Sequence, residues 1–150
     1  MSASDNVTVM REIFDALEGR DTQRLRDLFD PDIEFHWPPS LPYGGSGRGR
    51  DWQVSTWGET WDPLQPTAAE RRMDARVVAA SDNEVVVLWW QRGISPAGER
   101  FECPVLGLYQ VHAGMLTRAQ MFYFDTTAVA AFLERAASRM PVPESVALAK

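Results

Sequence analysis

The apolar positions of the N-terminal part of the chain repeat at helical spacing. Between residues 10 and 17 an apolar side chain returns every three or four positions, and Gly19 follows as a stop signal. Residues 4–6 (Ser, Asp, Asn) are candidate caps for this helix. A second, shorter helix is predicted from Asp21 or Thr22 until the Asp-Pro-Asp at 30–32, where proline cannot continue it.

The next stretch is short and irregular. Residues 33–37 read as a brief strand, and residues 38–50, "PPSLPYGGSGRGR", are too rich in Pro and Gly for regular structure, which predicts a loop. From Asp51 onward, apolar residues including Trp57 and Trp61 share a helical face until the prolines of 62–66.

The second half of the chain changes to the pattern of β-strands. Residues 71–80, 84–94, 100–112 and 116–124 are rich in Val, Leu and aromatic side chains, and turn sequences separate them. Four consecutive strands with tight turns form an antiparallel meander. We predict a closing helix from Ala128.

These elements predict an α+β fold in which a curved antiparallel sheet forms a cone, with the N-terminal helices covering it. The 150 residues are enough for one domain, and no repeat or linker divides them. We expect a single domain spanning 1–150, of which about 138–150 is a loosely held tail.

Composition excludes several classes of function. The net charge is −6 and the fifteen basic residues are scattered, so nucleic acid is not an expected partner. The sequence has no apolar run long enough for a membrane span and no signal-peptide pattern, which predicts a soluble, cytoplasmic protein without membrane association. Two histidines, a lone Cys103 and scattered acids show no metal-ligand spacing, so we expect neither a metal nor another cofactor.

Aromatic residues are abundant, with six Trp, seven Phe and three Tyr. Such a set is compatible with a large core or with a pocket for a flat apolar ligand. Trp89 and Trp90 are adjacent in a predicted strand, so only one of them can face the interior. We predict that Trp90 lines the pocket, together with Trp57 of the third helix.

Three longer segments carry a family resemblance: "LEGRDTQRLRDLFDPDIEFHWP", "GRGRDWQ" and "YQVHAGMLTRAQMFYFDTTAVAAFL". In their order and in the elements that they predict, they resemble the SnoaL-like polyketide cyclases of the nuclear transport factor 2-like superfamily, over roughly residues 7–137. The resemblance implies a cone-shaped α+β barrel that acts without a cofactor and forms homodimers. The same cone also carries isomerases, dehydratases, epoxide hydrolases and proteins without catalysis.

The resemblance also implies roles for particular residues. In the cyclases an Asp at the end of the last strand is the general base of an aldol ring closure, and Asp125 occupies that place. A Gln-x-His on the preceding strand lines the pocket, and Gln110 and His112 match it. Two relatives fit less well, because Trp37 stands where the ketosteroid isomerases have their basic Asp, and Gly93 and Ile94 follow Arg92 where the epoxide hydrolases have Arg-x-Asp.

Strand alternation places Met121, Tyr123 and Asp125 on one face. Among apolar neighbours a carboxylate loses hydration, which disfavours its charged form and suits it to move protons near neutral pH. His112 could then donate to a developing oxyanion, with Gln110 or Tyr123 supplying a further hydrogen bond. The alternative is that Asp125 is the N-cap of the final helix.

The predicted site therefore has two catalytic residues, Asp125 and His112, and a set of substrate-binding residues. The latter are Gln110, Tyr123, Met121, Trp90, Trp57, Trp37, His36 and Tyr43.

We expect a cyclase that closes a ring of a polyketide-like apolar substrate by aldol condensation. A dehydratase or isomerase acting on a similar substrate is an alternative, and a non-catalytic binder of an aromatic metabolite is another. The partners expected are a small apolar molecule in the central pocket and a second copy of the chain, because both faces of the predicted sheet are apolar.

Overall fold

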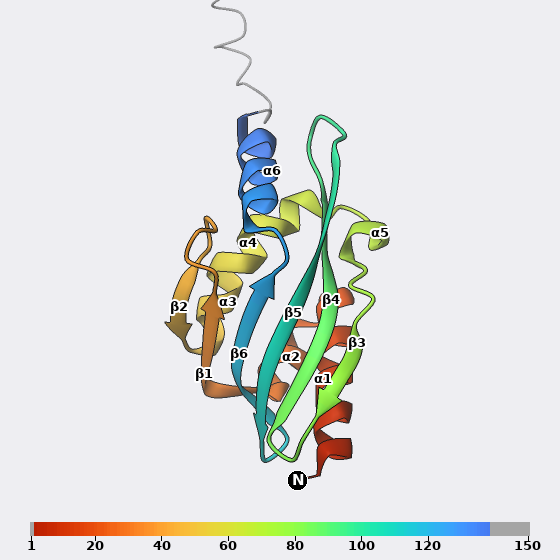
Figure 1. The fold of residues 1–150 in the computed structure, drawn as a ribbon, viewed down its shortest axis with the longest axis vertical. Coiled ribbons are helices and arrows are strands. Elements are labelled where there is room, and N and C mark those ends of the chain that lie inside the picture. The colour runs from red at the N-terminus through yellow and green to blue at the C-terminus, as the bar shows by residue number, and fades with distance from the viewer. Residues whose placement is uncertain (1, 139–150) are drawn as a thin grey trace, which may run out of the picture.

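A single six-stranded sheet forms the frame of the molecule (Figure 1). The computed structural model describes residues 2–138, without the side chains of 52–55. The strand order is β2-β1-β6-β5-β4-β3, and each neighbouring pair is antiparallel except β1 and β6, which are parallel. The strands are β1 Phe29–Trp37, β2 Gly45–Arg48, β3 Arg76–Ala80, β4 Glu84–Ile94, β5 Arg100–His112 and β6 Met115–Tyr123.

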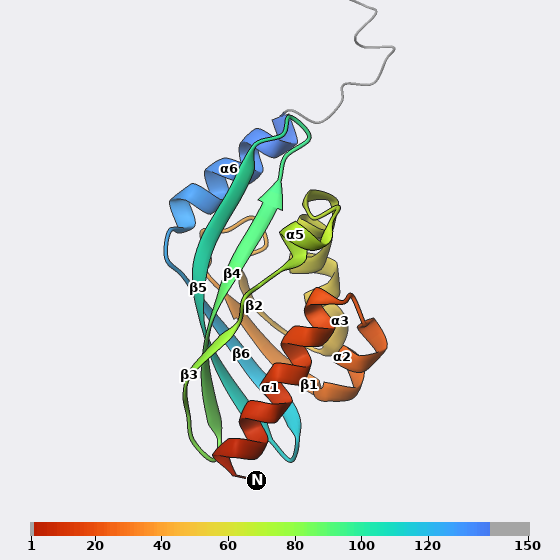
Figure 2. The same cartoon turned by 90° about the vertical axis from the view of Figure 1, so that its right-hand side faces the viewer.

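Helices cover one face of this curved sheet, and α6 lies across the end opposite the N-terminus (Figure 2). A continuous helical stretch runs from α3 through the π-helix η1 into α4. The helices are α1 Ala3–Glu18, α2 Thr22–Leu28, α3 Arg50–Gln53, η1 Val54–Gly58, α4 Glu59–Trp61, the 3-10 helix η2 Asp62–Leu64, α5 Ala68–Arg71 and α6 Thr126–Ser138. None of the helices within the described part of the chain is both long and apolar enough to span a membrane.

The predicted α+β class and the antiparallel meander are confirmed, and β4 and β5 have the predicted bounds. The cap of α1 is Ser2 rather than a residue of 4–6, because Ser2 and Asp5 form a reciprocal capping box. The predicted strand 71–80 begins only at Arg76. A second capping box, between Thr67 and Glu70, starts the short helix α5 (Ala68–Arg71), and residues 72–75 connect this helix to β3.

The prediction that residues 38–50 lack regular structure is wrong in part. Gly45–Arg48 pairs with β1 as the edge strand β2, bounded by Gly45 and Gly49 with φ of 106° and 102°. The preceding turn is compact, and a Cβ on Gly44 would lie 2.1 Å from the Pro38 carbonyl oxygen. This turn buries the side chain of Tyr43. The tail predicted beyond residue 138 lies outside the described residues.

Alternation along the central strands separates an inner face from an outer one. On β4, Trp89 and Gln91 are buried whereas Trp90 is half-buried on the opposite face. On β5, Tyr109 points inward and Gln110 outward. The inner face packs against α1 and the α3 to α4 stretch, so any interior site must be built from these inward positions.

Candidate functional site

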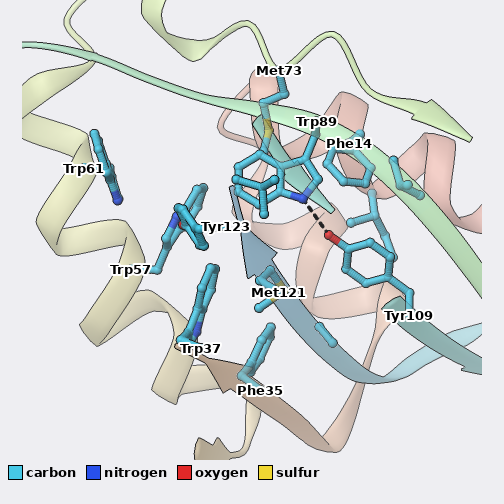
Figure 3. Close-up of a cluster of buried hydrophobic side chains, with 14 of the residues drawn as sticks. Phe14, Phe35, Trp37, Trp57, Trp61, Met73, Trp89, Tyr109, Met121 and Tyr123 are labelled. Atoms are coloured by element: carbon cyan, nitrogen blue, oxygen red, sulfur yellow. Dashed lines mark hydrogen bonds between the residues drawn. The ribbon is translucent and has the colours of Figure 1, made fainter. Parts of the chain in front are cut away.

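The concave face of the sheet encloses a small apolar cavity of about 30 Å³. Space of this size holds about one water molecule. Aromatic residues of α1, β1, η1, β4 and β5 make up half of its described lining, and none of these lining residues carries a carboxylate, an imidazole or an amine (Figure 3). The lining residues include Phe14, Trp37, Trp57, Trp89, Tyr109 and Met121.

Trp89 and Tyr109 meet at one side of this cavity. The Trp89 indole Nε1 donates a hydrogen bond of 2.9 Å to the Tyr109 hydroxyl (Figure 3). Gly107 makes this pairing possible, since a Cβ there would lie 2.2 Å from the Tyr109 hydroxyl oxygen. The Tyr109 ring can therefore lie along its own strand and reach β4.

Trp37 and Trp57 form the opposite side of the cavity. Their rings are nearly parallel, at 9°, with centroids 5.9 Å apart. Trp57 belongs to the π-helix Val54–Gly58, and such single π-turns inside α-helices occur frequently at functional sites.

A chain of buried hydrogen bonds adjoins the stacked tryptophans. The Tyr43 hydroxyl donates to the Tyr123 hydroxyl at 2.7 Å, and Tyr123 donates to Gln91 Oε1 at 3.1 Å. The Trp57 indole donates to the same amide oxygen at 2.7 Å. Gln91 is 1% exposed, so it is the buried acceptor on which two separate donors converge.

All three tyrosines of the chain stay protonated near neutral pH. Burial raises the pKa of Tyr43 and of Tyr109 far above the ordinary phenol value. The pKa of Tyr123 is also raised, first by burial and then by the neighbouring Tyr43. These phenols can donate hydrogen bonds but cannot act as bases in the physiological range.

The predicted apolar surroundings of Asp125 are not found. Its side chain is exposed, and its Oδ1 accepts a hydrogen bond of 2.9 Å from the Ala128 backbone N–H. The strand ends at Tyr123, so alternation no longer determines the direction of a residue two positions later. Asp125 caps α6, which was the alternative interpretation.

Gln110 and His112 also lie elsewhere than expected. Both are on the outer face of β5, with Gln110 half-buried and His112 exposed beside the turn to β6. Tyr123 pairs with Val105, seven residues before His112. At about 3.3 Å per strand residue, the two predicted catalytic residues are therefore on the order of 20 Å apart along the sheet.

The remaining predicted binding residues divide between the two faces. Trp90 is on the outer face, 5.6 Å beneath the Arg92 guanidinium, so the tryptophan that faces the interior is Trp89. His36 is also on the outer face, where its Nδ1 lies 2.7 Å from Ser46 Oγ.

The other members of the predicted binding set are interior residues. Met121, Trp37 and Trp57 line the cavity, and Tyr43 and Tyr123 belong to the adjoining hydrogen-bond chain. Sequence reasoning missed Trp89, Gln91 and Tyr109. Alternation links Trp89 to Gln91, so a correct choice between the two adjacent tryptophans would have found both.

Comparison with known proteins identifies the family to which this fold belongs. The model of the SnoaL-like domain matches residues 10–119. The chain belongs to the SnoaL-like domain family. No curated protein matches this SnoaL-like chain in sequence.

Solved structures show the same fold at low sequence identity. TerC co-crystallised with polyporic acid is 19% identical, with a TM-score of 0.73 over 87% of this chain and 98% of that chain. A candidate polyketide cyclase from Xanthomonas campestris pv. campestris is 16% identical, with a TM-score of 0.67 over 87% and 98%. An NTF2-like protein from Burkholderia xenovorans is 22% identical, with a TM-score of 0.64 over 91% and 98%.

Proposed function

We propose that this SnoaL-like protein binds a small, flat, apolar molecule inside its cone. The observation that carries the proposal is the cavity wall, where stacked and edge-on aromatic rings border a void and none of the described lining residues is charged. Flat apolar ligands are held by such rings through area burial and ring stacking.

The occupant must displace part of the wall. Pockets for small organic ligands are usually about 300 Å³ or larger, whereas the void is about 30 Å³. We propose that the π-helix η1 moves to make room, because it carries Trp57 of the cavity wall on irregular helical backbone. An incoming flat molecule would take the place of the Trp57 ring against Trp37.

Binding without catalysis is the first form of this proposal, because the described lining of the cavity and the adjoining hydrogen-bond chain supply donors but no carboxylate. The phenols of Tyr43 and Tyr123 remain neutral, and Gln91 is an amide. They can orient and polarise a ligand carbonyl, but removal of an α-proton needs a base within reach of the carbon.

Aldol ring closure is the second candidate, favoured by the likeness to a candidate polyketide cyclase and to a protein crystallised with polyporic acid. It would require Asp125 to leave its place as the cap of α6 and enter the interior. Dehydration or isomerisation would require the same base.

Indane, a flat bicyclic hydrocarbon, tests binding in the interior. Titration followed by the indole N–H resonances should move those of Trp57 and Trp89 and leave that of the outward Trp90 in place. Ala119 lines the cavity, so Ala119→Val should fill it and weaken indane binding, whereas the matched Ala80→Val at an exposed strand position should not. Shifts confined to Trp90 would contradict the proposal.

Deuterium exchange separates binding from catalysis. 1-Indanone carries enolisable protons next to its carbonyl, so a protein with a positioned base would incorporate deuterium from heavy water faster than buffer alone. We expect no acceleration by the wild type, measured by mass spectrometry. Acceleration that disappears in Asp125→Asn would establish the second candidate instead.

The predicted homodimer also becomes a proposal, supported by the outer face of the sheet. Leu88, Leu106 and Phe122 follow one another in register across β4, β5 and β6. Leu106 and Phe122 are 41% and 50% exposed, and Phe124 is 84% exposed. A contiguous apolar sheet face of this kind is normally covered, and we propose a second copy of the chain as its cover.

Sedimentation at micromolar concentration tests this dimer. Leu106→Glu places a charge at the centre of the face without touching the interior, so it should produce a monomer with unchanged circular dichroism. The control Glu84→Gln alters a half-buried polar position on the same face of β4 and should remain dimeric. A monomeric wild type would overturn the proposal.

A further inference from the structure

The Trp57 indole donates its hydrogen bond to a residue of the sheet. Its Nε1 lies 2.7 Å from Gln91 Oε1, and Gln91 is a buried residue on the inner face of β4. An indole nitrogen can only donate, so this contact also identifies the carboxamide atom as the oxygen. The interior therefore contains a neutral acceptor whose partner is the ring that we propose moves.

This acceptor and its donor stand on backbone of different kinds. Gln91 pairs with Cys103 within the regular ladder between β4 and β5, and the Tyr123 hydroxyl of β6 donates a hydrogen bond of 3.1 Å to the same oxygen. Trp57, by contrast, stands on the π-helix η1. When η1 moves, the strands keep Gln91 Oε1 in place, and Tyr123 then fills only one of its two lone pairs.

The space that the Trp57 ring leaves has a defined shape. One side of it is the Trp37 ring, parallel to Trp57 within 9° at 5.9 Å between centroids, and another is the Trp89 ring, at 90° and 6.4 Å. In the close-up, the rings of Trp37, Trp57 and Tyr123 lie on the same side of the cluster (Figure 3). A flat molecule that stacks on Trp37 there meets Gln91 Oε1 at its edge, as the indole does.

We infer that the interior receives an uncharged, flat aromatic molecule with an N–H or O–H group on its edge, and that this group donates to Gln91 Oε1 in place of the Trp57 indole. The inference rests on the proposed function and specifies the class of ligand, of which indoles and phenols are examples. A ligand without a donor leaves one lone pair of a buried carbonyl without a partner. The donor is uncharged, because the described lining of the cavity holds no carboxylate to compensate a buried cation.

The test compares indole with benzothiophene, which has the same fused rings and carries sulfur where indole carries its N–H. The measured quantity is the ratio of their dissociation constants in the wild type, Gln91→Met and Gln110→Met. Methionine keeps the length of the side chain but has no strong acceptor, so the preference for indole should fall by about three- to tenfold in Gln91→Met relative to the wild type. Gln110→Met, at a half-buried position on the outer face of β5, should leave the ratio unchanged.

The outcomes separate this inference from the proposed function. If benzothiophene moves the indole N–H resonances of Trp57 and Trp89 and Gln91→Met leaves the ratio unchanged, the role of Gln91 is wrong and interior binding stands. If neither benzothiophene nor indane binds in the interior, the proposed function fails and the inference fails with it.

A second measurement uses the wild type and so does not depend on how Gln91→Met folds. With isotope-labelled indole bound in the interior, a nuclear Overhauser effect should connect the N–H proton of the ligand to the side-chain protons of Gln91, because a hydrogen bond places these groups side by side. Interior binding of indole without this effect would overturn the inference.

Discussion

Tyr123 and Asp125 are separated by one residue, yet their environments are opposite. Tyr123 is the last residue of β6, is buried, and has a hydroxyl that takes part in two hydrogen bonds within the interior. Asp125 is exposed and accepts a hydrogen bond from a backbone N–H at the start of α6. The strand fixes the direction of the first residue and the helix that of the second, so the residue with the more reactive side chain is the one outside.

This difference moves the chemistry of the interior from a carboxylate to neutral donors. A carboxylate would have served as a base, whereas buried phenols and indoles recognise acceptor atoms. Substitutions at interior positions should therefore have larger effects than substitutions at neighbouring surface positions.

The largest effect is expected from the two adjacent tryptophans of β4. Trp89→Ala should lower the free energy of unfolding by about 3–5 kcal/mol, because it leaves a cavity and deprives the Tyr109 hydroxyl of its donor. Trp90→Ala on the outer face should cost about 1 kcal/mol. Urea denaturation measures both, and equal losses would contradict the assignment of faces.

A smaller effect is expected at the end of β6. Tyr123→Phe keeps the ring but removes the hydroxyl that joins Tyr43 to Gln91, so the free energy of unfolding should fall by about 1–3 kcal/mol. Thermal or urea denaturation reports the change. A variant as stable as the wild type would mean that these hydrogen bonds contribute nothing beyond what water provides.

Removal of the cap should cost less again. Asp125→Ala loses the bond to the Ala128 N–H and should destabilise the protein by about 1 kcal/mol, whereas Asp125→Asn keeps a capping oxygen and should change stability little. Neither substitution should alter the affinity for indane. A loss of affinity in Asp125→Asn with unchanged stability would place this side chain in the ligand site after all.

The last effect appears only at alkaline pH. The folded state raises the tyrosine pKa values above the unfolded value of about 10, so the neutral phenols stabilise the fold below that pH. This stabilisation is lost as the pH rises above about 10. Tyrosinate absorbance should therefore appear together with unfolding in an alkaline titration, and ionisation of a folded protein near pH 10 would contradict the burial of these phenols.

The fold was largely predictable because periodicity reports it directly. Alternation predicted the strands β4 and β5, and helical spacing predicted α1. The tight turns between consecutive strands predicted the antiparallel meander. One error arose where a local hydrogen bond determines the start of a helix, as at Ser2. Another arose where a glycine-rich segment pairs with a neighbouring strand, as in β2. Tertiary pairing of that kind leaves no periodic signal.

The site was less predictable, for a related reason. Alternation gives two faces but does not say which is inside, and the pocket positions of Gln110 and His112 were implied by the family resemblance, whereas both lie on the outer face of β5. Gly107 was the neglected signal, since a glycine between bulky residues indicates a close approach, here by Tyr109. Asp125 shows a different limit, because alternation ends where the strand ends.

A crystal structure of the protein with 1-indanone bound tests the central claim most directly. We predict electron density for the ligand between Trp37 and Trp89, in the place of the Trp57 ring, with Asp125 still bonded to the Ala128 N–H. Density for 1-indanone beside the Asp125 carboxylate, or on the outer face of the sheet, would contradict the account.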